Sequence, residues 1–199
     1  MLEKEIPFEI HITIDSLKIN YRQDFVEFCQ KKEAKPLFIE LSQGDFVHQP
    51  MLSKVVCSKN FDEILEFSSE LSRELEILNF HVKRLKIEVP SVNWSLFQNF
   101  STKFEKYYEW HCKIDFIRND ELLKMCEKHK VHLSLNSLKN DISTRFITLR
   151  EFGTNQQFES RISAISKDLE KQKRVINKQQ SEYCIYDNNT FLDNGWLPQ

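Results

Sequence analysis

Alternation of apolar and polar residues is the feature that most restricts the fold of this chain. Successive side chains of a β-strand point to opposite faces, so a period of two predicts strands with one apolar and one polar face. Apolar residues spaced by three and four instead predict helices, most clearly over 60–78 and 155–174. The clearest alternating segments are FEIHITI (8–14), VKRLKIEV (82–89), YEWHCKI (108–114) and VHLSLN (131–136).

The order strand, helix, strand, strand, helix, strand occurs twice along the chain. Equivalent positions keep a nearly constant separation: His11 and His111 lie 100 residues apart, and Leu41 and Leu135 lie 94 apart. Constant order with constant spacing indicates an internal duplication. The first copy has strands at 8–14, 37–41, 51–57 and 82–89 and helices at 24–32 and 60–78; the second has strands at 107–114, 131–135, 144–150 and 182–186 and helices beginning at a cap on Asn119 and at 155.

This order predicts an α+β protein made of two pseudo-symmetric β-α-β-β-α-β (ferredoxin-like) halves. Each half is expected to form an antiparallel sheet with both helices on its outer face, so that the bare polar faces meet across a central cleft. The predicted boundaries are a first lobe at 1–90, a connector at 91–106, a second lobe at 107–187 and a C-terminal cap segment at 188–199.

The polar strand faces carry the candidate ligand-binding residues. Arginine offers a planar fork and lysine a point charge to a phosphate or carboxylate, so these faces predict an anion site. Cross-strand pairs between lysine and glutamate are the structural alternative. Asp187, Asn188 and Asp193 are expected to reach the same ligand from the cap segment. The candidates on the strands are Thr13, Lys86, Glu109, His111, Lys113, Ser134, Asn136 and Arg150.

Overall charge and cysteine usage narrow the function classes. A net charge of -2 and a pI near 6.3 give no bias toward bulk duplex nucleic acid or an anionic membrane. Five cysteines without a C-x-x-C pair, no basic start and no long apolar run predict a cytoplasmic protein. No histidine or cysteine spacing of a metal site is present, so no metal and no cofactor is expected. The oligomeric state stays open.

Two short motifs, HITI (11–14) and HLSL (132–135), fit the pattern H-x-[ST]-x. Here the chain resembles the two-histidine phosphoesterases, the RNA ligase-like and cyclic phosphodiesterase-like enzymes. The resemblance implies His11 and His132 as catalytic acid and base, with Thr13 and Ser134 holding phosphate oxygens without a metal. That family carries its motifs on equivalent strands, whereas here the internal repeat pairs His11 with His111. The partner of His11, either His132 or His111, is left open.

A broader set of segments resembles a group of uncharacterised bacterial proteins, which supports the fold and implies no reaction. The segments are KIE (86–88), YYEWHCK (107–113), HLSLN (132–136), RFITLR (145–150) and YDNNTFLDNGW (186–196). The predicted function is recognition of a small anionic, phosphate-bearing ligand such as a nucleotide or RNA end. The alternatives are a metal-independent phosphoesterase, which leaves open whether the protein is an enzyme, and a protein-interaction scaffold with an exposed aromatic patch at Trp94, Phe97 and Phe100.

Overall fold

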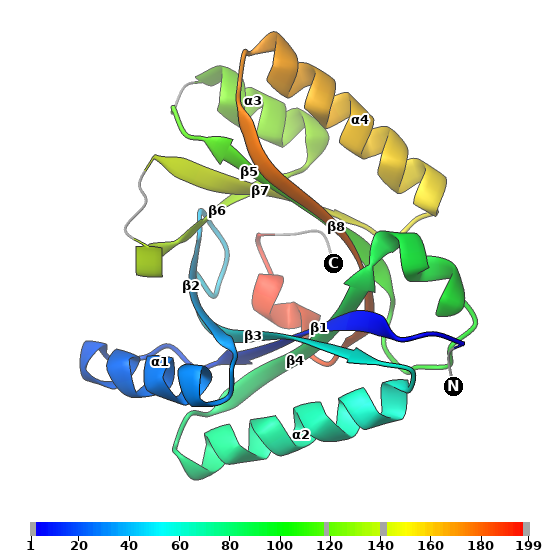
Figure 1. The fold of residues 1–199 in the computed structure, drawn as a ribbon. Helices are drawn as coiled ribbons and strands as arrows, with labels where there is room; N and C mark the ends of the chain where they lie inside the picture. The colour runs from blue at the N-terminus through cyan, green and yellow to red at the C-terminus, as the bar shows by residue number, and fades with distance from the viewer. Residues whose placement is uncertain (1–2, 118–119, 140–142, 197–199) are drawn as a thin grey trace.

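Eight strands form one closed antiparallel barrel in the computed structural model, which describes residues 3–117, 120–139 and 143–196 (Figure 1). Around the barrel the order is β1-β3-β2-β6-β7-β5-β8-β4. The strands are β1 (Ile6–Ile14), β2 (Lys35–Leu41), β3 (His48–Ser58), β4 (Val82–Pro90), β5 (Tyr107–Asp115), β6 (His132–Asn136), β7 (Thr144–Glu151) and β8 (Ile176–Asp187).

The prediction of two open ferredoxin-like sheets facing a cleft is wrong. Two strand pairings join the halves. Residues 39–41 of β2 pair with 134–136 of β6, and residues 86–90 of β4 pair with 182–187 of β8. We call these pairings the seams. A sheet edge exposes unpaired backbone N–H and C=O groups, and closure into a barrel satisfies them. The polar strand faces therefore line the bore of one barrel rather than a cleft between two lobes.

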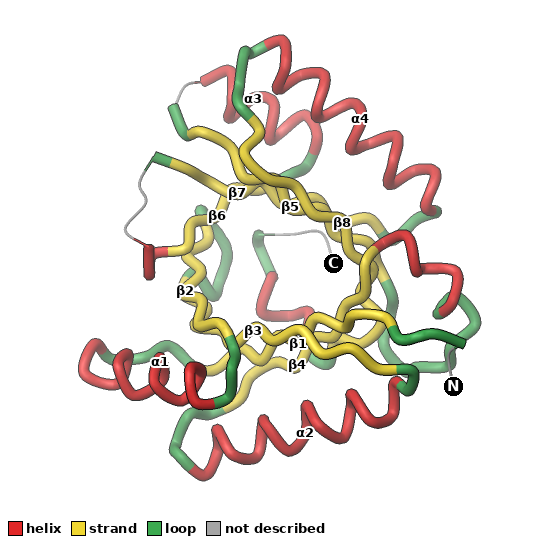
Figure 2. Tube along the Cα trace, viewed as in Figure 1, coloured by secondary structure: helices red, strands yellow, loops and turns green. Residues whose placement is uncertain are grey.

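The helices α1 (Arg22–Lys31), α2 (Phe61–Ile77), α3 (Asp120–His129) and α4 (Asn155–Lys171) lie outside the barrel (Figure 2). Local capping fixes where two of them begin. The Asn60 side chain accepts a hydrogen bond from the Asp62 N–H at the start of α2. Thr154 and Gln157 form a capping box at the start of α4. The predicted cap Asn119 lies outside the described residues.

The hydrophobic core lies between the helices and the outer face of the barrel. On β1 the apolar residues Phe8, Ile10 and Ile12 are fully buried and belong to this core. Phe97, which follows the 3-10 helix η2 (Ser91–Leu96), is 2% exposed and packs edge-on against Phe8. The aromatic segment between the halves therefore covers the core and does not present Phe97 as part of an exposed patch.

Strand β8 is longer than the sequence pattern predicts. The charged run 167–180 is typical of a frayed helix end, but α4 ends at Lys171 and β8 begins at Ile176. The break falls at Lys173, whose φ of 54° is left-handed, while the Arg174 N–H donates back to the Leu169 carbonyl. Residues 176–181 consequently extend a strand whose inner face adds charged and polar groups to the bore.

After β8 the chain turns back and closes one end of the bore. The 3-10 helix η4 (Thr190–Asp193), red in Figure 1, lies across the barrel opening. Gln49 donates to the Leu192 carbonyl at 2.9 Å, and the Trp196 indole donates to the Leu133 carbonyl at 3.4 Å. Gly44, with φ of 109°, lies so close to this segment that a Cβ would sit 2.9 Å from the Asn194 carbonyl oxygen. We call 188–196 the plug.

The seam between β2 and β6 joins only 39–41 to 134–136, whereas β1 pairs with β3 along nearly its whole length. Short strand pairings open at a lower free energy than long ones. We expect hydrogen exchange, followed by mass spectrometry, to show β2 and β6 exchanging before β1 and β3 at neutral pH. Equal protection of all four strands would contradict the idea that this seam is the weakest point of the closed barrel.

Candidate functional site

The bore holds a cavity of about 390 Å³ that combines a charged wall with an apolar wall. Strands β2 and β3 contribute the apolar side chains Leu37, Ile39 and Met51, and the plug contributes Trp196. The ionisable residues come mainly from β1, β4, β5 and β8. They are Glu9, His11, Arg84, Lys86, Glu109, His111, Lys113, Lys178 and Glu182, with Lys35 from β2 and Asp193 from the plug.

The end of the bore opposite the plug is the accessible mouth, and lysines surround it. Strands β2 and β8 end beside the plug, at Leu41 and Asp187, so their first residues lie at the far end. There Lys35 and Lys178 are exposed and border the cavity, together with Lys113 at the end of β5. Three ammonium groups around one opening attract anions and raise their local concentration.

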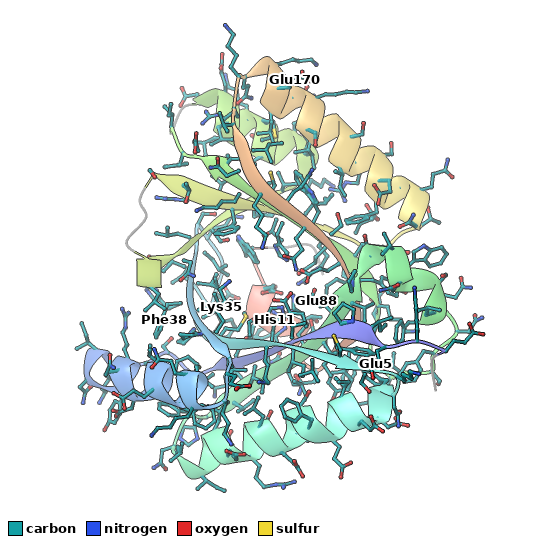
Figure 3. The ribbon with its side chains drawn as sticks, in the orientation of Figure 1. Glu5, His11, Lys35, Phe38, Glu88 and Glu170 are labelled. Atoms are coloured by element: carbon teal, nitrogen blue, oxygen red, sulfur yellow. The ribbon has the colours of Figure 1, made fainter. Side chains whose placement is uncertain are left out.

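Each half of the barrel contributes one Glu-x-His pair to the cavity: Glu9 with His11 on β1, and Glu109 with His111 on β5. The His11 Nε2 atom lies 3.0 Å from a Glu88 carboxylate oxygen and 3.6 Å from Glu9. The His111 Nε2 atom lies 3.3 Å from Glu109, and its Nδ1 lies 3.1 Å from the Thr148 hydroxyl. In Figure 3, His11 and Glu88 lie in the interior of the barrel. Both imidazoles are therefore oriented by carboxylates while bordering the same space.

Glu9 and Glu182 form a hydrogen-bonded carboxyl pair bridged by Gln180. The Gln180 amide donates to Glu9 at 2.9 Å and to Glu182 at 2.8 Å. Burial and the nearby charges of Glu88 and Glu9 raise the pKa of Glu182 to about 10. Burial also opposes ionisation of Glu9, but His11 and the hydrogen bonds from Glu182, Ser53 and Gln180 lower its pKa to about 2. At neutral pH the pair therefore carries one proton, which is bound to Glu182, while Glu9 is ionised.

A buried ionic network forms the floor of the cavity next to the plug. Arg84 donates to Asp187 at 2.9 and 2.5 Å, and Arg150 donates to Glu109 at 3.0 and 2.8 Å. Lys86 donates to the other Glu109 oxygen at 2.8 Å. Burial raises the pKa of Glu109 on its own, but Lys86 and Arg150 outweigh it and hold the pKa well below the usual value. Glu88 lies 3.0 Å from Lys86 and supplies the third carboxylate, so three carboxylates balance the three cations of this network.

The predicted site residues do not all reach the cavity. Thr13 and Arg150 are buried beside it, each 1% exposed, without bordering it. His132 lies at the plugged end, where its Nδ1 is 3.3 Å from the Gln43 amide and burial lowers its pKa. It borders a separate cavity of about 720 Å³ lined by β2, β6 and α3. The predicted residues that border the bore cavity are His11, Lys86, Glu109, His111, Lys113, Ser134 and Asn136.

Among the site residues that the sequence interpretation missed are Glu9, Lys35, Lys178, Gln180 and Glu182. Lys178 and Gln180 were hidden by the helical reading of the charged run, and Lys35 precedes a proline that marked the end of a helix. The alternation of 178, 180 and 182 was the signal that could have found three of them. The cap residues behave differently from one another: the Asn188 side chain accepts from the Leu85 N–H, whereas Asp193 borders the cavity.

Among the described residues, no group of three or more His, Cys, Asp or Glu side chains could hold a metal ion. None of the described helices has the length and apolar character needed to span a bilayer.

No known protein family and no curated protein matches the chain. The class that the fold and the site define is therefore a closed antiparallel barrel with an ionisable bore, plugged at one end.

The raised pKa of Glu182 makes the stability of the fold depend on pH. Between about 4.5 and about 10 the folded protein keeps a proton that the unfolded chain releases, so its stability falls as the pH rises. Glu182→Gln keeps an N–H donor toward Glu9 and has no proton to lose. We expect urea unfolding to show that the free energy of unfolding of the variant rises relative to that of the wild type from pH 6 to pH 9. The rise is at most about 1.4 kcal/mol per pH unit.

Glu159→Gln, on the exposed face of α4, is the control. Its free energy of unfolding is expected to change with pH in parallel with that of the wild type. A Glu182→Gln curve parallel to the wild type would show that Glu182 is ionised in the folded protein.

Proposed function

We propose that the barrel binds a small anionic ligand in its bore, with phosphate-bearing molecules such as a nucleotide or an RNA end as the ligand class. The observation that carries the proposal is the position of Lys35, Lys113 and Lys178 around the accessible end of a cavity that also holds His11 and His111. A volume of about 390 Å³ lies within the range of small-ligand pockets.

Charge pairing inside the bore supports placing the anionic group near the mouth. Lys86 already contacts Glu88 at 3.0 Å and Glu109 at 2.8 Å, so its charge is balanced within the protein. Lys35 and Lys178 are exposed at the mouth, where an incoming anion meets them first. A phosphate group there gains charge-assisted hydrogen bonds without displacing a buried carboxylate.

The remaining cavity wall suits the body of such a ligand. Leu37, Ile39 and Met51 offer an apolar surface for a base or another flat group. On the opposite side, the buried Nδ1 of His11 has no hydrogen-bond partner among the described residues. A buried polar atom without a partner costs free energy, and a ligand group that pairs with it recovers this cost.

We expect inorganic pyrophosphate and nucleoside monophosphates to bind saturably in calorimetric titrations. The double variant Lys35→Gln/Lys178→Gln is expected to bind about tenfold more weakly or worse, because each lysine contributes at least one charge-assisted hydrogen bond. Added salt should weaken binding to the wild type. Lys124→Gln, on the exposed surface of α3, is the matched control and keeps wild-type affinity. Equal affinity of the double variant and the wild type would refute the lysine-bordered mouth as the anion site.

A second candidate function is metal-independent phosphodiester cleavage with His11 and His111 as acid and base. The supporting observation is that both imidazoles border one cavity and that a carboxylate orients each of them. Such catalysis needs one group to deliver a proton while the other removes one, and an imidazole can serve in either role. His132, the partner that the motif resemblance implied, borders the separate cavity beside α3 instead, with its ring 6.3 Å from the Trp196 indole.

Hydrolysis of 2′,3′-cyclic nucleotides tests this candidate. His11→Gln and His111→Gln are each expected to lower the rate by about 10²- to 10⁴-fold, the usual contribution of a general acid or base. His81→Gln, a change of an exposed histidine, is the control. If His132→Gln abolishes cleavage while His111→Gln does not, the motif-based pair is correct and the pair bordering the bore is not.

A further inference from the structure

We propose that Arg84 and Arg150 form a second anion-binding site, at the plugged end of the bore, and that Asp193 fills it as an intramolecular carboxylate ligand. The chemical class that this site takes is a small monoanion with a planar carboxylate-like group. The site is separate from the lysine-bordered mouth, so the inference does not depend on the proposed function.

The first observation is the convergence of two guanidinium groups on one carboxylate. Arg84 comes from β4 and Arg150 from β7, and both approach the same Asp193 oxygen, at 2.9 and 2.5 Å. The three side chains are nearly inaccessible, with Arg84 3%, Arg150 1% and Asp193 2% exposed. A pair of arginine forks aimed at a single point is the arrangement that recognises carboxylate and phosphate groups.

The second observation is the number of guanidinium donors that only Asp193 satisfies. Lys86 is balanced by Glu88, so Asp187 and Glu109 are left to pair with Arg84 and Arg150, one carboxylate for each arginine. The Nη1 atom of Arg84 and the Nη2 atom of Arg150 both also reach Asp193. In addition, one terminal nitrogen of Arg150 is buried without a hydrogen-bond partner among the described residues. The arginine pair therefore has donors for a further carboxylate oxygen beyond its two partners on the barrel wall.

The third observation is that Asp193 belongs to a segment distinct from the barrel wall. The plug follows the last strand, and side-chain hydrogen bonds such as those from Gln49 to Leu192 and from Trp196 to Leu133 hold it. The arginines are fixed independently, since Asp187 and Glu109 hold them on neighbouring strands. Loss of the Asp193 carboxylate therefore leaves a preformed pocket in which buried guanidinium N–H groups have lost their acceptor, and a buried donor without a partner costs free energy. An anion from solution that enters this pocket relieves that cost.

The test is chemical rescue of Asp193→Ala by formate and acetate. Thermal unfolding is measured in sodium formate, sodium acetate and sodium chloride at equal ionic strength. We expect Asp193→Ala to have a lower Tm than the wild type, formate and acetate to recover most of the loss in a saturable manner, and chloride to recover little. The wild type, whose site is filled, should respond equally weakly to all three salts.

The matched control is Asp168→Ala, which removes a less buried carboxylate contacting Lys128 and His129 at 2.6 and 2.9 Å. In this control variant, water can solvate the cationic side chains that lose the carboxylate, so formate should not raise its Tm. The proposal is overturned if formate raises the Tm of Asp193→Ala no more than chloride does, or raises the wild type equally. Such a result would assign Asp193 a purely structural role.

Asp193→Ser provides a second variant in case Asp193→Ala does not fold, because its hydroxyl keeps a polar group in the plug while the shorter side chain leaves room for formate. Titration calorimetry with formate should give binding at least about tenfold tighter for Asp193→Ser than for the wild type. Equal or undetectable binding to both proteins overturns the proposal.

Discussion

Closure of the barrel is the constraint on which the other features of this protein depend. When β2 pairs with β6 and β4 pairs with β8, every polar strand face is turned into one enclosed bore. Charged groups there lose most of their water, and an unpaired buried charge costs far more than a paired one. The network from Arg84 to Glu109 shows how opposite charges pair in the bore. Glu182 shows the other solution, in which a buried carboxyl keeps its proton and stays neutral.

The sequence predicted which residues share a strand face, but it did not predict that the two sheets close into one barrel. Alternation identified which residues of β1, β4 and β5 share the polar face, because that property depends only on the period of a strand. Whether the two halves remain open sheets or join at their edges depends on pairing between residues far apart, such as Ile39 with Asn136, and no local pattern records it. The charged run before β8 misled the interpretation for a related reason: lysines and glutamines at a barrel mouth look like the solvent face of a helix. Lys178 and Gln180 were lost in that way.

The histidines illustrate how strand direction decides which groups meet. His11 and His132 carry the similar motifs, yet β6 begins beside the plug, so His132 lies at the closed end. His11 and His111 sit at central positions of β1 and β5, opposite Lys86 and Gln180 on the neighbouring strands. Motif similarity alone therefore selected a pair that the barrel separates, whereas the constant spacing of the repeat selected a pair that shares one cavity.

The plug makes the two ends of a nearly repeated barrel chemically different. On β4 the residue opposite Thr13 is Arg84, and on β8 the residue opposite Lys113 is Lys178. Arg84 lies at the plugged end of the bore and contacts Asp187 and Asp193, while Lys178 lies at the opposite end and is exposed. The same position in the repeat is thus neutralised internally at one end and left to the solvent at the other. This asymmetry leaves the exposed cations that border the cavity at the end away from the plug.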